Sequence, residues 1–288
     1  MIVKPFELIY PTAEFWEAKM KKVFYVSMLV LSTLLLQDRG ALAAMQEKVK
    51  FYQLTYQTEN VIGRIAVNGF VLTELEGKSG NGTASLNPWL IGENELKVEV
   101  TKAYPSKPAE IVFGVSEMVQ GEMVSTTDRG RLFSLELKNK DFSAEGKASA
   151  AKKFKSDLDF KGHLSEAGEA KESDVIAYAQ KFYALFAKKD AEGILRESEV
   201  KINDYSKAFG GADMKTELRR YLTDELFNAK LNRLNPGALR AVAVGPTKNI
   251  WRVFNGKDEL IKGQSPDGST SELAVYIGLL DGKLKVVR

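Results

Sequence analysis

Histidine and cysteine, the side chains most used for nucleophilic and metal chemistry, are almost absent from this chain. The sequence has no cysteine and a single histidine, His163, in the polar stretch 161–164. One imidazole without a thiol cannot assemble a Ser-His-Asp site, a Cys-His site or an ordinary zinc site. We therefore expect no catalytic residue, no metal site and no cofactor, and we interpret His163 as a solvated loop residue.

Two aromatic residues of the N-terminal half could instead bind a ligand by stacking on a sugar ring. They are Trp89 and Tyr104, and both side chains combine an apolar ring with a polar tip. The competing interpretation for Trp89 is packing against a sheet, because its neighbours are Pro88 and Leu90.

The residues from Met20 to Ala43 read as a secretory signal peptide. Met20-Lys21-Lys22 precedes fourteen uncharged residues, 23–36, and a small-x-small site follows at Ala41-Leu42-Ala43. Fourteen residues span roughly 21 Å as a helix, which is short of the ~30 Å hydrocarbon layer and disfavours a membrane anchor. We expect cleavage near Ala43 and a leader over residues 1–43. Whether residues 1–19 are translated stays open.

This interpretation places the product in the periplasm or outside the cell. Removal of residues 1–43 leaves 36 Lys and Arg against 34 Asp and Glu, a net charge of +2. A balance so close to neutral, without a basic stripe, argues against nucleic acid as a partner. No membrane span is expected after cleavage.

Residues 46–142 show the two-residue period of half-buried strands. The run Glu95–Val100 alternates strictly, and Asn68-Gly69 between two apolar runs is a strong hairpin signal. We predict an antiparallel β-sandwich. Its expected strands lie at 51–58, 65–67, 70–72, 85–90, 95–100, 109–119 and 131–138.

The pattern changes after residue 142. Residues 143–172 are rich in Ala, Lys, Glu and Ser, and we predict a charged linker with a short helix over 148–157. Residues 173–288 first show helical periodicity, including a helix capped by Asp213, and then strands separated by Asn-Gly and Asp-Gly turns. The predicted fold class is therefore a β-sandwich domain followed by an α+β domain, in which helices pack on a curved antiparallel sheet.

The N-terminal half resembles accessory β-sandwich modules of galactose-binding-like and immunoglobulin-like type. The resemblance rests on the Asn68-Gly69 turn and on the run 86–98, in which Gly92 and Asn94 precede the strand that contains Leu96 and Val98. It covers about thirty residues of the chain. In that family the motif is structural, so the resemblance implies a fold more than a function.

The C-terminal half is similar to the nuclear-transport-factor-2-like superfamily, which includes ketosteroid isomerase. The similarity rests on element order, helices before hairpins, and on the final run 279–288, although the Trp common in that last hairpin is absent. Such folds often enclose a cone-shaped pocket. The resemblance implies a candidate lining of aromatic residues here, for which plain core packing is the alternative: Tyr178, Phe182, Tyr221, Trp251 and Tyr276.

An isomerase-like member would also need a buried carboxylate as a base. Asp204 beside Tyr205 is the nearest such pair, with Asp224 and Glu225 further along, but Asp204 equally fits a helix cap.

We therefore expect a non-catalytic, exported envelope protein that binds another macromolecule, including an immunity or inhibitor role towards a protein partner. The alternatives are a carbohydrate-binding protein and a small-molecule carrier or isomerase-like enzyme. A homodimer through the C-terminal domain is left open.

Overall fold

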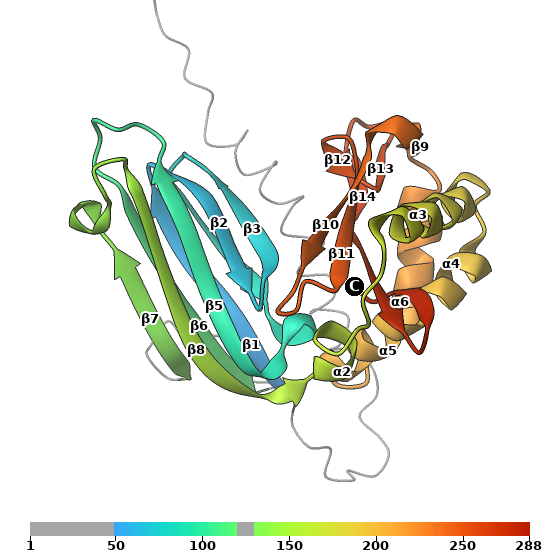
Figure 1. The fold of residues 1–288 in the computed structure, drawn as a ribbon, viewed down its shortest axis with the longest axis horizontal. Coiled ribbons are helices and arrows are strands. Elements are labelled where there is room, and N and C mark those ends of the chain that lie inside the picture. The colour runs from blue at the N-terminus through green and yellow to red at the C-terminus, as the bar shows by residue number, and fades with distance from the viewer. Residues whose placement is uncertain (1–48, 120–129) are drawn as a thin grey trace, which may run out of the picture. The chain divides into compact units, whose positions relative to one another are not determined.

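The computed structural model describes residues 49–119 and 130–288, and antiparallel sheets dominate them (Figure 1). About 47% of the residues are strand and 26% are helix, so the fold is rich in sheet and has few helices. The strands form four sheets, and all strand pairs recorded are antiparallel. Lys48–Arg288 forms one compact unit. The expected leader and signal peptide, residues 1–43, lie outside the described residues.

Two four-stranded sheets are built from the first half of the described chain, with strand orders β4-β1-β6-β7 and β3-β2-β5-β8. Their strands are β1 (Lys50–Glu59), β2 (Val61–Val67), β3 (Phe70–Glu76), β4 (Gly80–Ser85), β5 (Ile91–Lys102), β6 (Glu110–Val119), β7 (Arg131–Leu137) and β8 (Lys147–Asp159).

These two sheets share one hydrophobic cluster, and strand alternation explains how. In β5, Leu96, Val98 and Val100 are buried, whereas the residues between them point away from the cluster. Leu54 of β1 and Val115 of β6 enter the same cluster from the other sheet. The Asn68-Gly69 hairpin is confirmed, with φ values of 51° and 81° at the two turn residues.

The predicted linker over 143–172 is wrong at its centre, because residues 147–159 form strand β8. This strand pairs along its length with β5, from Thr101↔Lys147 to Ile91↔Asp159. The short helix predicted over 148–157 is therefore also wrong. Strand β8 is an edge strand, and its exposed lysines are typical of edges that must not pair with another chain.

The strand predicted over 85–90 is wrong as well. Strand β4 ends at Ser85, and Asn87–Trp89 form a 3₁₀ turn, η2, with Pro88 in its first turn. Proline suits the first turn of a helix because the N–H that it lacks would have no partner there. Asn87 is fully buried and accepts a hydrogen bond from the backbone N–H of Tyr52 at 2.7 Å.

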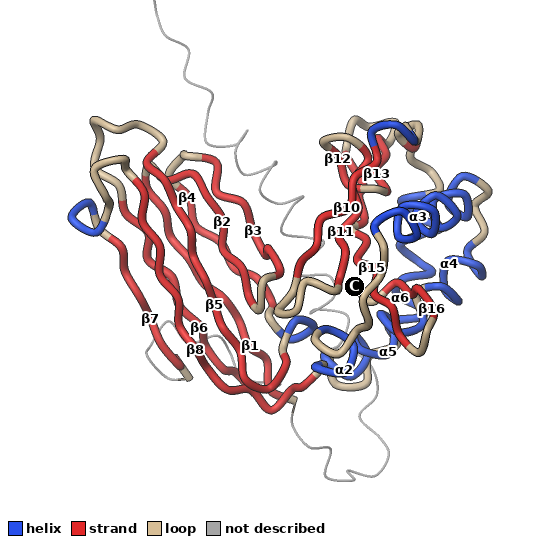
Figure 2. Tube along the Cα trace, in the orientation of Figure 1, coloured by secondary structure: helices blue, strands red, loops and turns tan. Residues whose placement is uncertain are grey.

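Helices occupy the middle of the chain, and the remaining strands follow (Figure 2). The predicted helix cap at Asp213 is confirmed. The carboxylate of Asp213 accepts a hydrogen bond from Thr216 N at 3.0 Å at the start of α6. The helical elements are η3 (Asn139–Asp141), α2 (Lys161–Leu164), α3 (Glu172–Ala187), α4 (Ala191–Glu197), α5 (Glu199–Ala208), α6 (Met214–Tyr221), the π-helical turn η4 (Leu222–Leu226) and the 3₁₀ turn η5 (Pro236–Ala238).

The later strands form a sheet of order β10-β11-β15-β16, with β12 paired to β11, and a small sheet of order β14-β13-β9. They are β9 (Lys230–Leu231), β10 (Leu239–Val244), β11 (Ile250–Asn255), β12 (Asp258–Glu259), β13 (Ile261–Gln264), β14 (Thr270–Leu273), β15 (Val275–Leu280) and β16 (Lys283–Val286).

Helices α3, α4 and α6 lie together on one side of these strands (Figure 1). Phe182 of α3 and Leu222 of η4 share a hydrophobic cluster with Val253 of β11 and Ile277 of β15. Ile250 and Tyr276, which alternate with those strand residues, instead join a third cluster. The sheet therefore buries apolar side chains on both of its faces.

The third cluster joins segments from both halves of the chain. Phe70 and Trp89 come from the first half, and Tyr276 and Val287 come from the last strands. The ring centroids of Phe70 and Trp89 are 5.0 Å apart, and those of Trp89 and Tyr276 are 5.2 Å apart. This aromatic contact makes the two halves depend on each other for burial.

A buried ion pair lies beside this cluster. Arg288 is 1% exposed, and its Nη1 lies 2.5 Å from Oδ2 of Asp204 on α5. Its Nε also donates to the carbonyl of Pro88 in η2 at 2.7 Å. The guanidinium therefore connects the end of the chain, just after β16, to α5 and to the η2 turn in the first half of the chain.

We predict that Asp204→Asn lowers the free energy of unfolding by about 3–5 kcal/mol, because it leaves the buried charge of Arg288 without its counter-ion. Urea denaturation followed by tryptophan fluorescence measures the change. Asn203→Ala, an exposed position on the same helix, is the control and should change stability little. A loss below about 1 kcal/mol for Asp204→Asn would contradict this role of the pair.

Candidate functional site

A recess in the described surface lies on the outer face of the sheet β3-β2-β5-β8. It is an open depression of about 830 Å³. Its walls come from β2, β3, β5 and β8 and from the segment just before β8. The side chains that give it its chemical character are Ile62, Arg64, Glu74, Glu99, Phe142 and Lys147.

Strand register brings these side chains together. In β2, Val61 and Ile65 point into the core, so Ile62 and Arg64 point outward. Arg64 is opposite Glu74 of β3 and also opposite Glu99 of β5. Because directly opposed side chains on one face lie about 5 Å apart, the three charges form a row across the sheet.

Small residues shape the floor of the depression. A Cβ at Gly63 would lie 2.1 Å from the carbonyl oxygen of Glu99, so only glycine allows β2 to approach β5 this closely. Ala148 and Ser149 of β8 also line the floor, and Ser149 is opposite Glu99. The short side chain of Ser149 leaves the face open between the longer charged groups, whereas the side chain of Ala148 packs against the core cluster of the two sheets.

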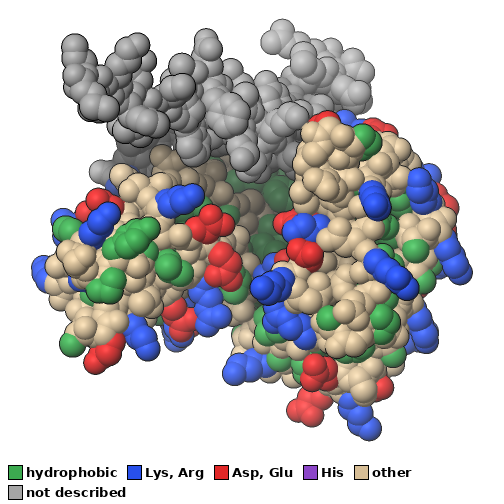
Figure 3. All heavy atoms as spheres, turned by 90° about the horizontal axis from the view of Figure 1, so that it is seen from above, with side chains coloured by type: hydrophobic (Ala, Val, Ile, Leu, Met, Phe, Trp, Pro, Cys, Tyr) green, Lys and Arg blue, Asp and Glu red, His purple; other side chains and the backbone are tan. Residues whose placement is uncertain are grey.

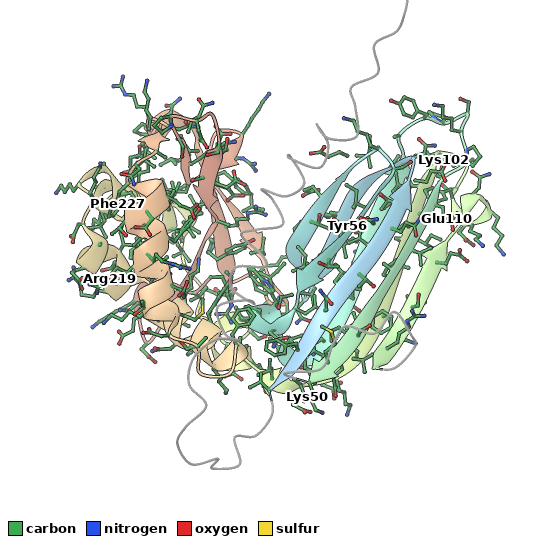
Figure 4. All side chains as sticks on the ribbon, turned by 180° about the vertical axis from the view of Figure 1, so that it is seen from behind. Lys50, Tyr56, Lys102, Glu110, Arg219 and Phe227 are labelled. Carbon is green, nitrogen blue, oxygen red and sulfur yellow. The ribbon has the colours of Figure 1, made fainter. Side chains whose placement is uncertain are left out.

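The segment before β8 supplies the outer wall. The ring of Phe142 lies near the ammonium group of Lys102, whose Nζ is 5.6 Å from the ring centroid. Figure 4 shows Lys102 and Lys50 at opposite ends of the first-half strands. The depression therefore lies at the end of β5 that is remote from the η2 turn, since Trp89 of η2 precedes the start of that strand.

The charges of the depression are only partly paired. Glu99 accepts hydrogen bonds from Arg64 Nη2 at 2.7 Å and pairs with Lys97 at 2.6 Å. Lys97 and then Arg64 hold the pKa of Glu99 below its usual range. Within residues 49–119 and 130–288, no ion pair is recorded for the carboxylate of Glu74 or the ammonium of Lys147. The charge of Glu74 also acts on Arg252 of β11, and Asp141 on the wall of the depression accepts a hydrogen bond from the backbone N–H of Lys138.

An apolar patch lies among these charges. Ile62 is 50% exposed and is one of the few large apolar side chains with that much solvent contact in the described residues. An exposed apolar side chain among charges of both signs suits contact with another protein surface.

The five aromatic residues predicted to line a C-terminal pocket do not all meet. Tyr178, Phe182, Tyr221 and Trp251 belong to the cluster between helices and sheet, whereas Tyr276 lies in the third cluster with Phe70 and Trp89. Tyr276 projects from the opposite sheet face because it alternates with Val275 and Ile277.

The hydroxyl groups of these tyrosines have partners or are buried. Tyr178 donates to Glu197 Oε2 at 2.6 Å, and Tyr221 donates to the carbonyl of Glu272 at 3.0 Å. Burial raises the pKa of Tyr221 and of Tyr276 to about 12. Burial and the Glu197 carboxylate raise the pKa of Tyr178 further. Trp251 Nε1 is buried without a partner among the described residues.

The two aromatic residues predicted to stack on a sugar lie at opposite ends of β5. Trp89 precedes the strand and packs between Phe70 and Tyr276. Tyr104 follows the strand, is 57% exposed and has Lys107 Nζ 4.7 Å from its ring centroid. A twelve-residue strand separates them by about 35 Å, so they cannot stack on the same sugar ring.

His163 and Asp204 differ from their sequence interpretations. Asp204 lies inside α5, not at a helix end, and its side chain is 7% exposed. His163 Nδ1 lies 2.9 and 3.0 Å from the two carboxylate oxygens of Asp204. Sequence reasoning missed this group because its members are 41 and 84 residues apart along the chain. The only signal was the adjacency of Asp204 and Tyr205.

Lys201, one turn before Tyr205 on α5, belongs to the same region. Its Nζ lies 5.7 Å from the ring centroid of Tyr205. Burial, and then the charge of Arg288, lower the pKa of Lys201 to about 8.

Comparisons with family models, curated proteins and solved structures find no match to this chain. Across residues 49–119 and 130–288, no group of three His, Cys, Asp or Glu side chains is placed to hold a metal ion. In the same residues, none of the helices combines the length and apolar character that crossing a membrane requires.

We predict that Gly63→Ala destabilises the protein by about 2–3 kcal/mol, because the added methyl must push β2 away from β5. Thermal and urea unfolding measure the change. Gly80→Ala is the matched control, since its Cβ would meet no atom closer than 3.9 Å. Equal effects of the two substitutions would show that the close approach at Gly63 is unimportant.

We also predict that Lys201 makes stability rise with pH. Its pKa is about 8 in the folded chain and 10.5 as a free side chain, so between these values the unfolded chain binds the extra proton. Stability therefore increases by up to about 1.4 kcal/mol per pH unit in this window, and below pH 8 the penalty is fully present. Lys201→Met should be more stable near pH 7 and should lose this slope. Parallel slopes for both proteins in urea titrations would contradict the prediction.

Proposed function

We propose that this protein is an exported, non-catalytic envelope protein that binds a protein partner through the depression on β3-β2-β5-β8. In this proposal a β-sandwich domain is followed by an α+β domain, and cleavage near Ala43 releases the chain to the periplasm or the exterior. The observation that carries the proposal is the exposed Ile62 in a depression that also presents the carboxylate of Glu74 and the ammonium of Lys147.

The chemistry of the depression defines the partner. A complementary surface would place an apolar side chain against Ile62 and Phe142, a cation opposite Glu74 and an anion opposite Lys147. Such pairs give specificity and orientation, while the apolar contact supplies most of the affinity. An immunity or inhibitor role towards another envelope protein fits this surface.

The surface charges support a protein partner over nucleic acid. Figure 3 shows basic and acidic side chains interspersed over the face in view. A nucleic-acid surface would concentrate basic residues along one face.

The two resemblances form part of the proposal. The shared cluster of the first two sheets supports a galactose-binding-like or immunoglobulin-like sandwich. Helices α3–α6 followed by strands β10–β16 support a nuclear-transport-factor-2-like second domain. The carbohydrate-binding alternative has less support, because Trp89 is engaged in the third cluster and lies far from Tyr104.

Capture from envelope extract tests the proposal. The tagged full chain is compared with Ile62→Asp and with the charge-inverted double variant Glu74→Lys/Lys147→Glu. We expect both variants to retain their fold and to lose about tenfold or more in partner affinity, as for the loss of a central interface contact.

Gln57→Asp provides the matched control, because Gln57 is an exposed position on the outer face of the other sheet. It should capture the partner as the unmodified chain does. Capture that is unaffected by both depression variants, or catalytic turnover by the purified protein, would overturn the proposal.

A further inference from the structure

The guanidinium of Arg288 has one buried nitrogen without a partner. Nε donates to Pro88 O at 2.7 Å, and Nη1 donates to Asp204 Oδ2 and to Val287 O, both at 2.5 Å. Nη2 is also buried but has no acceptor among the described residues. A buried N–H of a charged group that lacks an acceptor is costly, so this nitrogen should have a water molecule or an anion as its acceptor.

Among the side chains around this nitrogen, basic groups outnumber carboxylates. Asp204 is the single carboxylate paired with Arg288, and it shares its two oxygens with His163. Lys201 is close enough to Arg288 for the two charges to repel. Among the described residues Lys201 has no recorded ion pair, and its neighbour is the Tyr205 ring.

The surrounding elements do not remove this excess. Phe160, just before α2, lies under Arg288, with the guanidinium 5.2 Å from the ring centroid. Lys207 of α5 lies 5.6 Å from the same ring and adds a further cation. Burial raises the pKa of Tyr205, which keeps this phenol neutral. Cations on α5 and after β16 thus face an apolar ring and one shared carboxylate.

We propose that Arg288 and Lys201 bind a small oxyanion where α5, the η2 turn and the end of the last strand meet. Nη2 of Arg288 donates one hydrogen bond, and the ammonium of Lys201 supplies a second donor and the balancing charge. Guanidinium groups favour carboxylate and phosphate oxygens, so the ligand is a phosphate or a carboxylate. This site is separate from the depression on β3-β2-β5-β8, so it does not rest on the proposed function.

Proton linkage gives this site a distinctive signature. An anion beside Lys201 favours its charged form and raises its pKa from about 8 in the free protein. Acetate binding at pH 9 should therefore take up nearly one proton for each anion, whereas acetate binding at pH 7 should take up almost none. Phosphate changes its own protonation near neutral pH, so its proton uptake is read at pH 9. Affinity should fall as pH rises above 8. His163, Asp204 and Tyr205, which also face the site, remain in all the variants used below.

Isothermal titration of the full chain with inorganic phosphate and with acetate tests the proposal, against chloride at equal ionic strength. The titrations are repeated at pH 7 and pH 9 in buffers with different enthalpies of ionisation. The dependence of the observed binding heat on that enthalpy gives the number of protons taken up. We expect phosphate or acetate to bind better than chloride, to show proton uptake at pH 9 and to shift the Arg288 side-chain N–H resonances in NMR spectra. The stronger of the two anions identifies the ligand class.

Lys201→Met should weaken binding about tenfold or more and abolish the proton uptake, whereas Lys181→Met, a control at an exposed lysine of α3, should leave both unchanged. Lys201→Met removes an unpaired cation and should fold, so the test does not depend on substituting the buried Arg288. Phosphate and acetate binding no stronger than that of chloride, or binding unaffected by Lys201→Met, would overturn the proposal.

Discussion

The buried pair of Arg288 and Asp204 is the interaction on which the arrangement of the described chain depends. A guanidinium that loses nearly all contact with water must find several acceptors, and it finds them on three different segments. The aromatic cluster of Phe70, Trp89 and Tyr276 excludes water from the same region. The ion pair supplies direction and the cluster supplies apolar burial, so the loss of either one weakens contact between the two halves of the chain.

This arrangement separates two kinds of surface chemistry. Near Arg288 the structure places basic side chains around one buried carboxylate, an environment that we propose suits a small anion. At the other end of β5, the outer sheet face presents exposed side chains of both signs around Ile62. In the proposed anion site, selectivity for the ligand comes from charged groups that are removed from water. In the depression, selectivity for a partner comes from the shape of the surface and the positions of its charges. In our two proposals, one chain therefore carries two separate binding surfaces.

Local patterns in the sequence predict much of the fold. Strict alternation identifies β5, the Asn68-Gly69 turn identifies the β2–β3 hairpin, and Asp213 identifies the start of α6. Strand β8 escapes such reasoning because Lys, Ala and Ser have low strand propensity, and its edge position keeps most of its side chains in water. Pairing with β5 overrides that propensity, and the sequence carries no local sign of the pairing.

By itself, the sequence determined the element types wherever period and turn chemistry agree, and it determined the scarcity of imidazole and thiol groups. Only the tertiary structure decided which distant side chains meet. The sequence around Asp204 fits a helix cap, but in the structure Asp204 pairs with Arg288, which is 84 residues later in the chain. The sequence suggested one pocket lined by the five aromatic residues. In the structure, the alternation of side chains along β15 places Tyr276 on the other face of the sheet. The polarity of a side chain and its capacity for hydrogen bonding are fixed by the residue type. Its burial and its ion pairs depend on the packing of segments that are far apart in the chain.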